Sequence, residues 1–393
     1  MTTGLLAQCQ ADLEYVRAIR RELHRFPETG TDLPRTRALI LRELRNLPLL
    51  VREDVGGGIV ADLRGGRGAR IALRADMDAL PMQEETGLDF ASEIPGHGHM
   101  CGHDAHVAML LGAARLLAAR KSRLRGDVRF LFQPNEENHP GGAQAMIEAG
   151  CLDRVDEIFG LHLWPGKPVG WIGTRTGALM ARPDVFTIIL TGKGGHASAP
   201  HLCVDPVLAA SRLVCELQSI VSRRVSPLEP AVLSVTRFHA GTAYNIIPET
   251  VFLQGTVRTL ADDVGALVRG EMARLTDAVS SSTGTAASLE YVQGFPVLVN
   301  HAGSVQSLVQ AVRGAGMEID SHILPTMAGE DFSYYLQFRP GCFFFLGCGL
   351  QGPDGSGGLH NACFNPDEGC FPYGVAALTA LALCGGADPD RAC

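Results

Sequence analysis

The chain has 393 residues, 46% of them hydrophobic and 19% charged, which is enough for two domains with buried cores. Its formal net charge of −8, without any long basic run, excludes a general affinity for nucleic acid or acidic membranes. A membrane span is also excluded, because the longest apolar stretch near the C-terminus, residues 374–384, is far too short to cross a bilayer.

The amino-terminal segment predicts an amphipathic surface helix. Apolar residues recur there at helical spacing among charged ones, at Cys9, Leu13, Val16, Ile19 and Leu23. The segment lacks the basic, apolar and small-residue order of a secretory signal, and the eleven cysteines are dispersed without a framework spacing. We therefore expect mostly reduced, buried cysteines and a cytoplasmic location.

Strand-like and helix-like segments alternate through the first half of the chain. We predict strands at 71–74, 128–133 and 157–163 and a helix at 107–119. This alternation is typical of a largely parallel sheet between helices, in which functional residues gather just past the carboxyl ends of strands. Polar side chains occupy such places after three of the strands: Asp76 and Asp78, Glu136 and Glu137, and His162.

The pattern changes near residue 182. The next predicted elements are a strand at 185–191, a helix at 206–221, strands at 232–238 and 251–257, a helix at 264–279 and a strand at 287–292. Their order, βαββαβ, is the signature of a ferredoxin-like domain. Helix and strand alternation then resumes, with a buried strand at 342–347. The sequence therefore predicts an α/β protein with a discontinuous catalytic domain, residues 1–183 and 295–393, and an inserted ferredoxin-like domain, residues 184–294.

Cys101 and His103 place a thiol and an imidazole two residues apart, just before the predicted helix. The pair alone is a weak signal, because cysteine is often a buried hydrophobic residue. The preceding residues 96–100 are glycine-rich and polar, which is unlike a plain core segment. Further histidines lie at 97, 99 and 106, and some of these must be bystanders.

The adjacent carboxylates Glu136 and Glu137 are a sharper signal. They repel one another unless something positive lies beside them, and the alternative is a solvated loop. One carboxylate would bind a metal and the other would take a proton from water. His162 and His360 add imidazole nitrogens, although each alone could equally be a hydrogen-bonded core or loop histidine. Sulfur, nitrogen and oxygen ligands together indicate a metal-dependent hydrolase.

The predicted inserted domain carries a glycine-rich segment at 192–200 with His196 at its tip. It fails the G-x-x-x-x-G-K-[ST] pattern of a phosphate loop, and its glycines instead let the backbone approach another surface. Asn245 and Arg258 could reach a ligand carboxylate. Ordinary loop hydrogen bonding is the alternative for each.

Short strings then follow one another over nearly the whole chain, at residues 23–28 (LHRFPE), 74–81 (RADMDALP), 100–104 (MCGHD), 133–137 (QPNEE), 195–197 (GHA), 245–248 (NIIP), 328–332 (AGEDF) and 359–360 (LH). In this order they resemble the M20 metallopeptidase family. Within that family they are similar to the amidohydrolase branch of hippurate hydrolases, N-acyl-amino-acid deacylases and plant auxin-conjugate hydrolases.

The resemblance implies a site for two divalent metal ions with Glu136 as the general base. The positions that match its ligands are Cys101, His103, Glu137, His162 and His360. It also implies that the inserted domain carries His196 and Asn245 to the substrate. A thiolate ligand favours Zn, Co or Ni over Mg, and Mn is common in the family. The chain departs from the family at Asn135 and at residues 138–140, which flank the glutamates where other residues are common.

The resemblance implies hydrolysis of the amide bond of small N-acyl amino acids. The alternatives are a dipeptidase or carboxypeptidase of the same family, or a non-catalytic binding protein that kept the fold. Because His196 and the predicted metal ligands belong to different domains, we expect hinge closure on substrate near residues 182–184 and 294–296. The family also suggests a homodimer or homotetramer assembled through the inserted domain.

Overall fold

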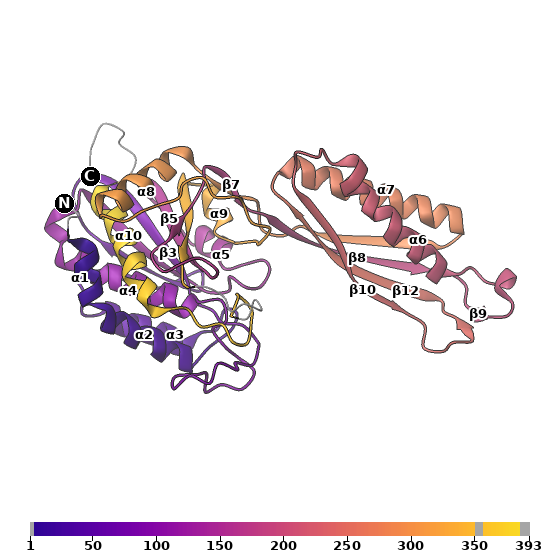
Figure 1. Ribbon diagram of the computed structural model, residues 1–393, viewed down its shortest axis with the longest axis horizontal. Helices are drawn as coiled ribbons and strands as arrows, with labels where there is room; N and C mark the ends of the chain where they lie inside the picture. Colours follow the sequence, from indigo (N-terminus) through magenta and orange to yellow (C-terminus); the bar gives the residue numbers. More distant parts are fainter. Residues whose placement is uncertain (1–3, 350–356, 386–393) are drawn as a thin grey trace. The chain divides into compact units, whose positions relative to one another are not determined.

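The computed structural model describes residues 4–349 and 357–385 of the chain. These residues form two compact units (Figure 1). Unit 1 comprises the chain up to Leu179, then Val299–Leu324, and the chain from Asp331 on. Unit 2 comprises Met180–Leu298 and Pro325–Glu330. The short strands β7 (Gly177–Met180) and β14 (Leu298–Asn300) lie where the chain passes from one unit to the other.

Unit 1 is built on a seven-stranded sheet in the order β1-β2-β4-β3-β5-β15-β6. The strands are β1 (Leu50–Val55), β2 (Gly58–Leu63), β3 (Gly68–Asp76), β4 (Gly126–Gln133), β5 (Glu157–Trp164), β6 (Ile172–Gly173) and β15 (Gly341–Gly347). The four central strands β4, β3, β5 and β15 are parallel, and the outer pairs are antiparallel. The predicted α/β class with a largely parallel central sheet is confirmed.

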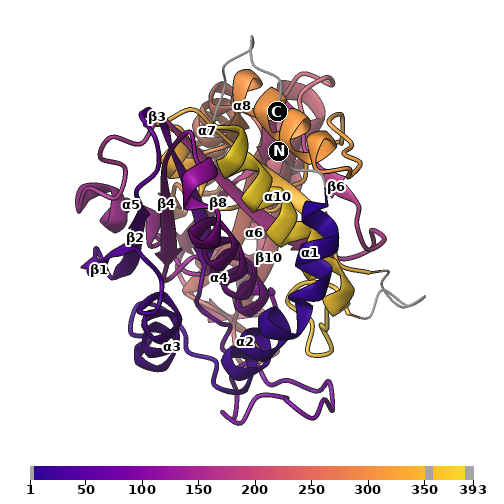
Figure 2. The ribbon, with the colours of Figure 1, turned by 90° about the vertical axis from the view of Figure 1, so that its left-hand side faces the viewer.

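The helices of unit 1 are α1 (Leu5–Ala11), α2 (Leu13–Arg25), α3 (Pro34–Leu44), α4 (His103–Ala119), α5 (Ala143–Glu148), α8 (Ala302–Gly314), α9 (Ser333–Leu336) and α10 (Phe371–Cys384). Figure 2 shows α1, α2, α4 and α10 grouped together, and α4 contacts β3. The amino-terminal segment forms two helices rather than the single helix we predicted, because the chain leaves helical geometry at Asp12.

Helix α4 is the central helix of unit 1. It is apolar on all sides, and nearly every residue from His103 to Leu117 is buried. A helix of this kind is stable only inside a core, and α4 packs between α2, α10 and the sheet. The apolar C-terminal stretch is likewise a core helix, α10. None of the helices in the two described ranges combines the length and hydropathy that a membrane crossing requires.

Nine of the ten cysteines in the described ranges are free thiols, and six of these are buried. Cys384 is disulfide-bonded. The prediction of mostly reduced, buried cysteines therefore agrees with the structure.

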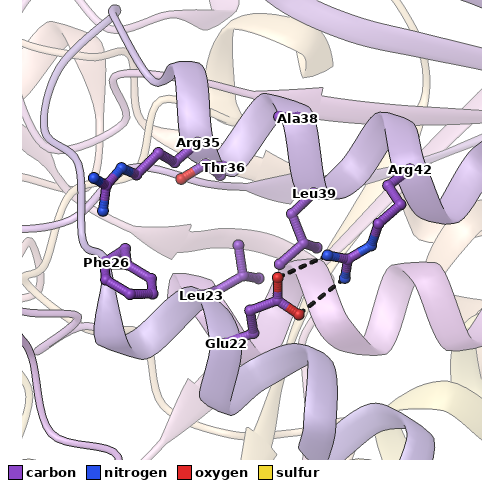
Figure 3. Close-up of a pocket in the computed structure, with 8 residues that line it drawn as sticks. All are labelled: Glu22, Leu23, Phe26, Arg35, Thr36, Ala38, Leu39 and Arg42. Atoms are coloured by element: carbon purple, nitrogen blue, oxygen red, sulfur yellow. Dashed lines mark hydrogen bonds and ion pairs between the residues drawn. The ribbon is translucent and has the colours of Figure 1, made fainter.

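A cavity of about 410 Å³ lies between α2 and α3, away from the candidate site described below (Figure 3). Leu23, Phe26 and Leu39 form its apolar wall. The Glu22 carboxylate closes one side by accepting hydrogen bonds of 2.7 and 2.9 Å from the Arg42 guanidinium.

Unit 2 contains a four-stranded antiparallel sheet in the order β10-β12-β8-β13. The strands are β8 (Arg182–Thr191), β10 (Ala231–Ala240), β12 (Thr250–Thr259) and β13 (Ala286–Val292), and the helices are α6 (Pro206–Ser219), which continues as a π-helical turn at Ile220–Arg224, and α7 (Asp262–Thr283). The chain order of these elements is βαββαβ. Alternate residues of β8, such as Phe186 and Ile188, are fully buried in a core shared with both helices.

Two glycines in helices give opposite stability predictions. A Cβ on Gly374 of α10 would lie 2.3 Å from Met109 Sδ and 3.0 Å from Leu346 Cδ2. Gly374→Ala should therefore destabilise unit 1 by about 1–3 kcal/mol through overpacking. A Cβ on exposed Gly270 of α7 meets nothing within 4 Å, so Gly270→Ala should stabilise unit 2 by about 0.5–1 kcal/mol. Chemical denaturation measures both, and equal effects of the two substitutions would contradict the packing argument.

Candidate metal centre

The carboxyl ends of three parallel strands bring the predicted polar side chains together. Asp76 at the end of β3 pairs with Gln133 at the end of β4, so the residues that follow each strand are neighbours. On the other side of β3, Arg74 pairs with Gly160 of β5, which places His162 level with Asp76. Because parallel strands all end at the same edge, the register alone assembles this group.

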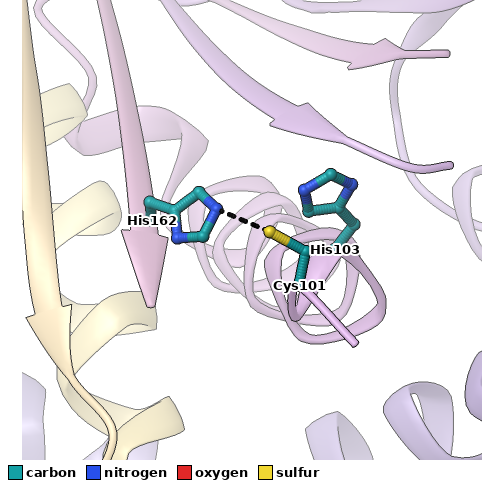
Figure 4. Close-up of side chains that lie close together, drawn as sticks. All are labelled: Cys101, His103 and His162. Carbon is teal, nitrogen blue, oxygen red and sulfur yellow. Dashed lines mark hydrogen bonds between the residues drawn. The ribbon is translucent and has the colours of Figure 1, made fainter. Parts of the chain in front are cut away.

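Cys101 and His103 approach the same edge from the start of α4. Gly102 between them has a positive φ of 92°, and a Cβ at this position would lie 3.0 Å from Leu163 Cδ1. Glycine is the residue that adopts this conformation without strain. The turn at Gly102 therefore lets Cys101 and His103 both face the strand ends. Cys101 Sγ lies 3.3 Å from His162 Nε2 (Figure 4).

His360 reaches the group from a loop that follows β15. Its backbone N–H donates a hydrogen bond of 2.8 Å to Met100 O, so the loop is fastened next to Cys101. His360 Nε2 lies 3.3 Å from Glu137 Oε1. Its side chain is 54% exposed, while the other four predicted ligands are buried or nearly so.

All five predicted metal ligands converge in the structure. Three overlapping groups have their ligand atoms within 4.8 Å of one another: Cys101, His103 and His162; Cys101, Glu137 and His360; and His103, Glu136 and Glu137. A further group contains Asp76, His103 and His106. Convergence is what the sequence leads us to expect, and metal ligation by these residues stays a prediction.

Backbone carbonyl groups orient the two buried imidazoles. His103 Nδ1 donates to Asp78 O at 2.9 Å, and His162 Nδ1 donates to Leu163 O at 2.7 Å. In the neutral ring, each hydrogen bond fixes the proton on Nδ1 and leaves the Nε2 lone pair facing the cluster. This arrangement is typical of histidines that bind metal through Nε2.

The donor atoms fit a divalent ion. His103 Nε2 and Glu137 Oε1 are buried, and neither makes a hydrogen bond. They lie 3.8 Å apart. Two ligands of one tetrahedral zinc ion, bound at about 2.0–2.3 Å, are separated by roughly 3.3–3.8 Å. The distances of 3.3 to 3.8 Å in this cluster are close to that spacing.

The electrostatics of the cluster favour a cation. Burial acts to lower the pKa of His103, but Asp76, Glu137 and Asp78 outweigh it and raise that pKa to about 10. Burial, followed by the nearby carboxylates of Glu137 and Glu136, raises the pKa of the Cys101 thiol well above its usual value. A thiolate therefore requires added positive charge here, which a bound divalent ion supplies.

Asp78 holds the two glutamates in place. Its Oδ1 accepts from Glu136 N at 2.9 Å and its Oδ2 accepts from Glu137 N at 3.2 Å. Asn135, just before them, has a φ of 56°. This left-handed conformation turns the two following N–H groups toward one carboxylate, and asparagine is among the residues that tolerate it best. Asparagine at 135 therefore suits the conformation of this turn.

His106 is a positioning residue rather than a ligand. Its Nδ1 donates to Asp76 Oδ1 at 2.6 Å, and its Nε2 accepts from Leu163 N at 3.0 Å. Both ring nitrogens are thus occupied, in a neutral ring, and burial lowers the pKa of this histidine. His106 links the end of β3 to the residue beside His162. We assigned no role to Asp76, Asp78 or His106 from the sequence, although both aspartates stood at a strand end.

His196 and Asn245 lie together in unit 2. His196 in β9 (Gly195–His196) pairs with Ile246 in β11 (Ile246–Ile247), and Ala197 N donates to Asn245 O at 3.0 Å. The exposed His196 ring accepts a hydrogen bond of 3.1 Å from Ser198 N at its Nδ1. A neutral ring then carries its proton on Nε2 as a donor.

Arg258 lies in the four-stranded sheet of unit 2, whereas His196 belongs to the separate two-stranded sheet β11-β9. Arg258 belongs to β12 opposite Pro183, and its guanidinium donates to Thr256 Oγ1 and Val257 O. Eight residues separate it from Thr250 at the start of the strand, a span of about 27 Å. The structure therefore does not bring Arg258 and Asn245 together within unit 2.

Comparison with known proteins agrees with this geometry. Residues 72–383 match the family model described as Peptidase family M20/M25/M40, and the chain belongs to this family. It is 41% identical over 355 residues to N-acetyl-L-cysteine deacetylase of Bacillus subtilis, covering 89% of this chain and 83% of the relative. It is 37% identical to thermostable carboxypeptidase 1 of Saccharolobus solfataricus, covering 94% and 95%.

A solved structure gives the same fold at 34% identity. It is the Bacillus subtilis YXEP protein, described as a dinuclear metal binding peptidase from the M20 family. Its TM-score is 0.83, and the match covers 95% of this chain and 98% of that one. Together with the donor atoms described above, this likeness supports divalent metal binding in the present chain.

Cys101→Ser tests the thiolate ligand. The substitution should weaken zinc binding by about tenfold or more, because a hydroxyl does not replace a soft thiolate ligand. The matched control is Cys151→Ser, which changes a buried free thiol outside the cluster. Metal content after purification and competition with a chelator measure the difference. Equal zinc retention by the two variants would remove Cys101 from the ligand set.

Proposed function

We propose that the protein is a metal-dependent amidohydrolase that cleaves N-acyl amino acids to a carboxylic acid and a free amino acid. The observation that supports this most strongly is the convergence of sulfur, nitrogen and carboxylate ligands beside a second carboxylate, that of Glu136. The relative named N-acetyl-L-cysteine deacetylase favours the same chemistry.

The proposed site holds two divalent ions, drawn from Zn, Mn, Co or Ni, through Cys101, His103, Glu137, His162 and His360. Such ions supply Lewis-acid activation of water and of the amide carbonyl. Glu136 acts as the general base: its carboxylate takes the proton of the attacking water and then delivers it to the departing nitrogen. Asp78 holds the backbone of Glu136 during both transfers.

Glu136→Gln tests the base. The amide keeps the shape of the side chain but has no basic oxygen, so kcat should fall by about 10²–10⁴-fold while both metals stay bound. Glu137→Gln should instead lose metal along with activity, because it removes a ligand. Steady-state kinetics together with elemental analysis distinguish the two variants. A Glu136→Gln enzyme within tenfold of the parent would show that Glu136 is not the base.

We further propose that unit 2 acts as a lid that carries His196 and Asn245 to the substrate, with hinges near residues 182–184 and 294–296. The Nε2–H of His196 fits the role of a donor to the oxyanion that forms on the amide carbonyl. Arg258 is proposed to meet a substrate carboxylate from the hinge end of the sheet. The same unit is proposed to join copies into a homodimer or homotetramer, which sedimentation of the purified protein measures.

His196→Ala should lower kcat by about 10²-fold, the usual effect of losing one oxyanion donor. His201→Ala is a suitable control, because His201 is an exposed histidine of the same unit. Kinetics with one N-acyl amino acid compares the variants. Similar rates for both would contradict the role of His196.

A carboxypeptidase is the second candidate function, favoured by the relative named thermostable carboxypeptidase 1. Parallel assays of the metal-reconstituted enzyme with N-acetyl amino acids, N-benzoyl amino acids and dipeptides separate the two. We expect faster turnover of the N-acyl substrates. A preference for dipeptides would replace the amidohydrolase proposal, and no turnover of any substrate would favour a binding protein. The cytoplasmic location stays a prediction.

A further inference from the structure

Asp331 belongs to the string at 328–332, to which the proposed mechanism gives no role. Its carboxylate is fully buried in unit 1 and accepts hydrogen bonds from three residues. Gln133 Nε2 donates to Oδ1 at 2.8 Å and to Oδ2 at 2.6 Å. Ala143 N donates to Oδ2 at 3.1 Å, and Arg74 Nη2 donates to Oδ1 at 2.8 Å.

Two of these donors stand at the ends of one loop. Gln133 is the last residue of β4 and Ala143 is the first residue of α5. Between them, residues 134–142 carry Glu136 and Glu137. One carboxylate thus fastens both ends of the segment that presents the proposed base.

The glycines at the end of this loop make the closure possible. Gly141 has a φ of 86°, and a Cβ there would lie 2.5 Å from Asp331 Oδ2. A Cβ on Gly142 would lie 1.9 Å from Pro134 O. A side chain at Gly141 would push the loop away from Asp331, and one at Gly142 would push the two ends of the loop apart, so the local sequence is adapted to this closure.

A buried network extends from Asp331 toward the other ligands. Arg74 donates to Asp331, to Gln133 Oε1 at 2.9 Å and to Asp76 Oδ2 at 2.8 Å. Asp76 in turn accepts from His106, which is bonded to Leu163 N beside His162. A carboxylate oxygen of Asp331 also lies within 4.8 Å of one of Glu136. Both Asp331 oxygens already accept N–H groups, so the residue serves as an anchor and not as a further ligand.

We propose that Asp331 is a positioning residue that fixes the loop 134–142 and thereby holds Glu136 in its working position. The role given to Glu136 rests on the proposed function, while the anchoring of the loop does not. Asp331 acts through the loop and does not touch the substrate.

The test compares Asp331→Asn with Asp62→Asn. Asp62 is a matched control, because it is a buried aspartate of unit 1, in β2, whose carboxylate accepts hydrogen bonds from Arg129 at 2.7 and 2.8 Å, away from the loop. In Asp331→Asn, one amide N–H₂ must face donors of Gln133, Ala143 or Arg74. Hydrogen–deuterium exchange of the segment 134–142 should therefore become faster in this variant and stay at the parent rate in Asp62→Asn.

Kinetics provides the second measurement. Asp331→Asn should lower kcat by about 10- to 100-fold, since a small displacement of a catalytic group has an effect of this size. KM should stay near the parent value, and Asp62→Asn should keep the parent kcat. All variants are assayed saturated with metal, because Glu137 lies on the same loop. Gln133→Ala removes the same anchor from the other side. Gln133→Ala should show the same faster exchange in the segment 134–142 and the same fall in kcat. The double variant Asp331→Asn with Gln133→Ala should lower kcat little further than either single substitution.

The outcomes separate the two proposals. Parent-like exchange in the segment 134–142 of Asp331→Asn, or equal faster exchange in both aspartate variants, would overturn the anchoring role. If Asp331→Asn does not fold, parent-like exchange and kcat in Gln133→Ala would overturn it equally. If the parent hydrolyses no N-acyl amino acid or dipeptide, the proposed function fails, and the exchange measurement still decides the role of Asp331.

Discussion

The structure of unit 1 depends on how it accommodates negative charge at the carboxyl ends of β3 and β4. Asp76, Asp78, Glu136 and Glu137 all follow these two strands, and the parallel register brings them together. Like charges at this spacing are unfavourable unless cations or donors lie among them. Arg74 and backbone N–H groups meet part of this demand, and a divalent ion at the proposed site would meet the rest.

The proposed ligands depend on a surrounding layer of hydrogen-bonded residues. Backbone carbonyl groups fix the ring orientation of His103 and His162, and His106 joins the ends of β3 and β5. The Asp78 carboxylate likewise holds the middle of the loop 134–142, by accepting hydrogen bonds from the backbone N–H groups of Glu136 and Glu137. Long flexible side chains cannot hold a metal geometry alone, so this outer layer decides how well the centre is formed.

Much of the fold could be predicted from the spacing of apolar residues along the sequence. The central strands and the helices of unit 2 lie within a few residues of their predicted ranges, because their apolar residues repeat at the spacing of strands or helices. The break at Asp12 was not predicted, since the apolar period continues across it. Local geometry overrides periodicity at such points.

The candidate ligands were predictable from residue type and from their place after strands, whereas the residues that orient them were not. Asp78 acts through its main chain and side chain at once, and His106 acts through two hydrogen bonds to distant segments. Such roles depend on contacts between segments far apart in sequence. The separation of Arg258 from Asn245 likewise results from the length of β12, which the short sequence motifs do not reveal.

The exposure of His360 bears on whether a metal ion could bind before or after the chain folds. Four of the five candidate donors are enclosed by the sheet and α4, while this imidazole faces solvent. An ion can enter from that side once the chain has already folded. The proposed metal site could therefore be filled after folding, without reopening the hydrophobic interior.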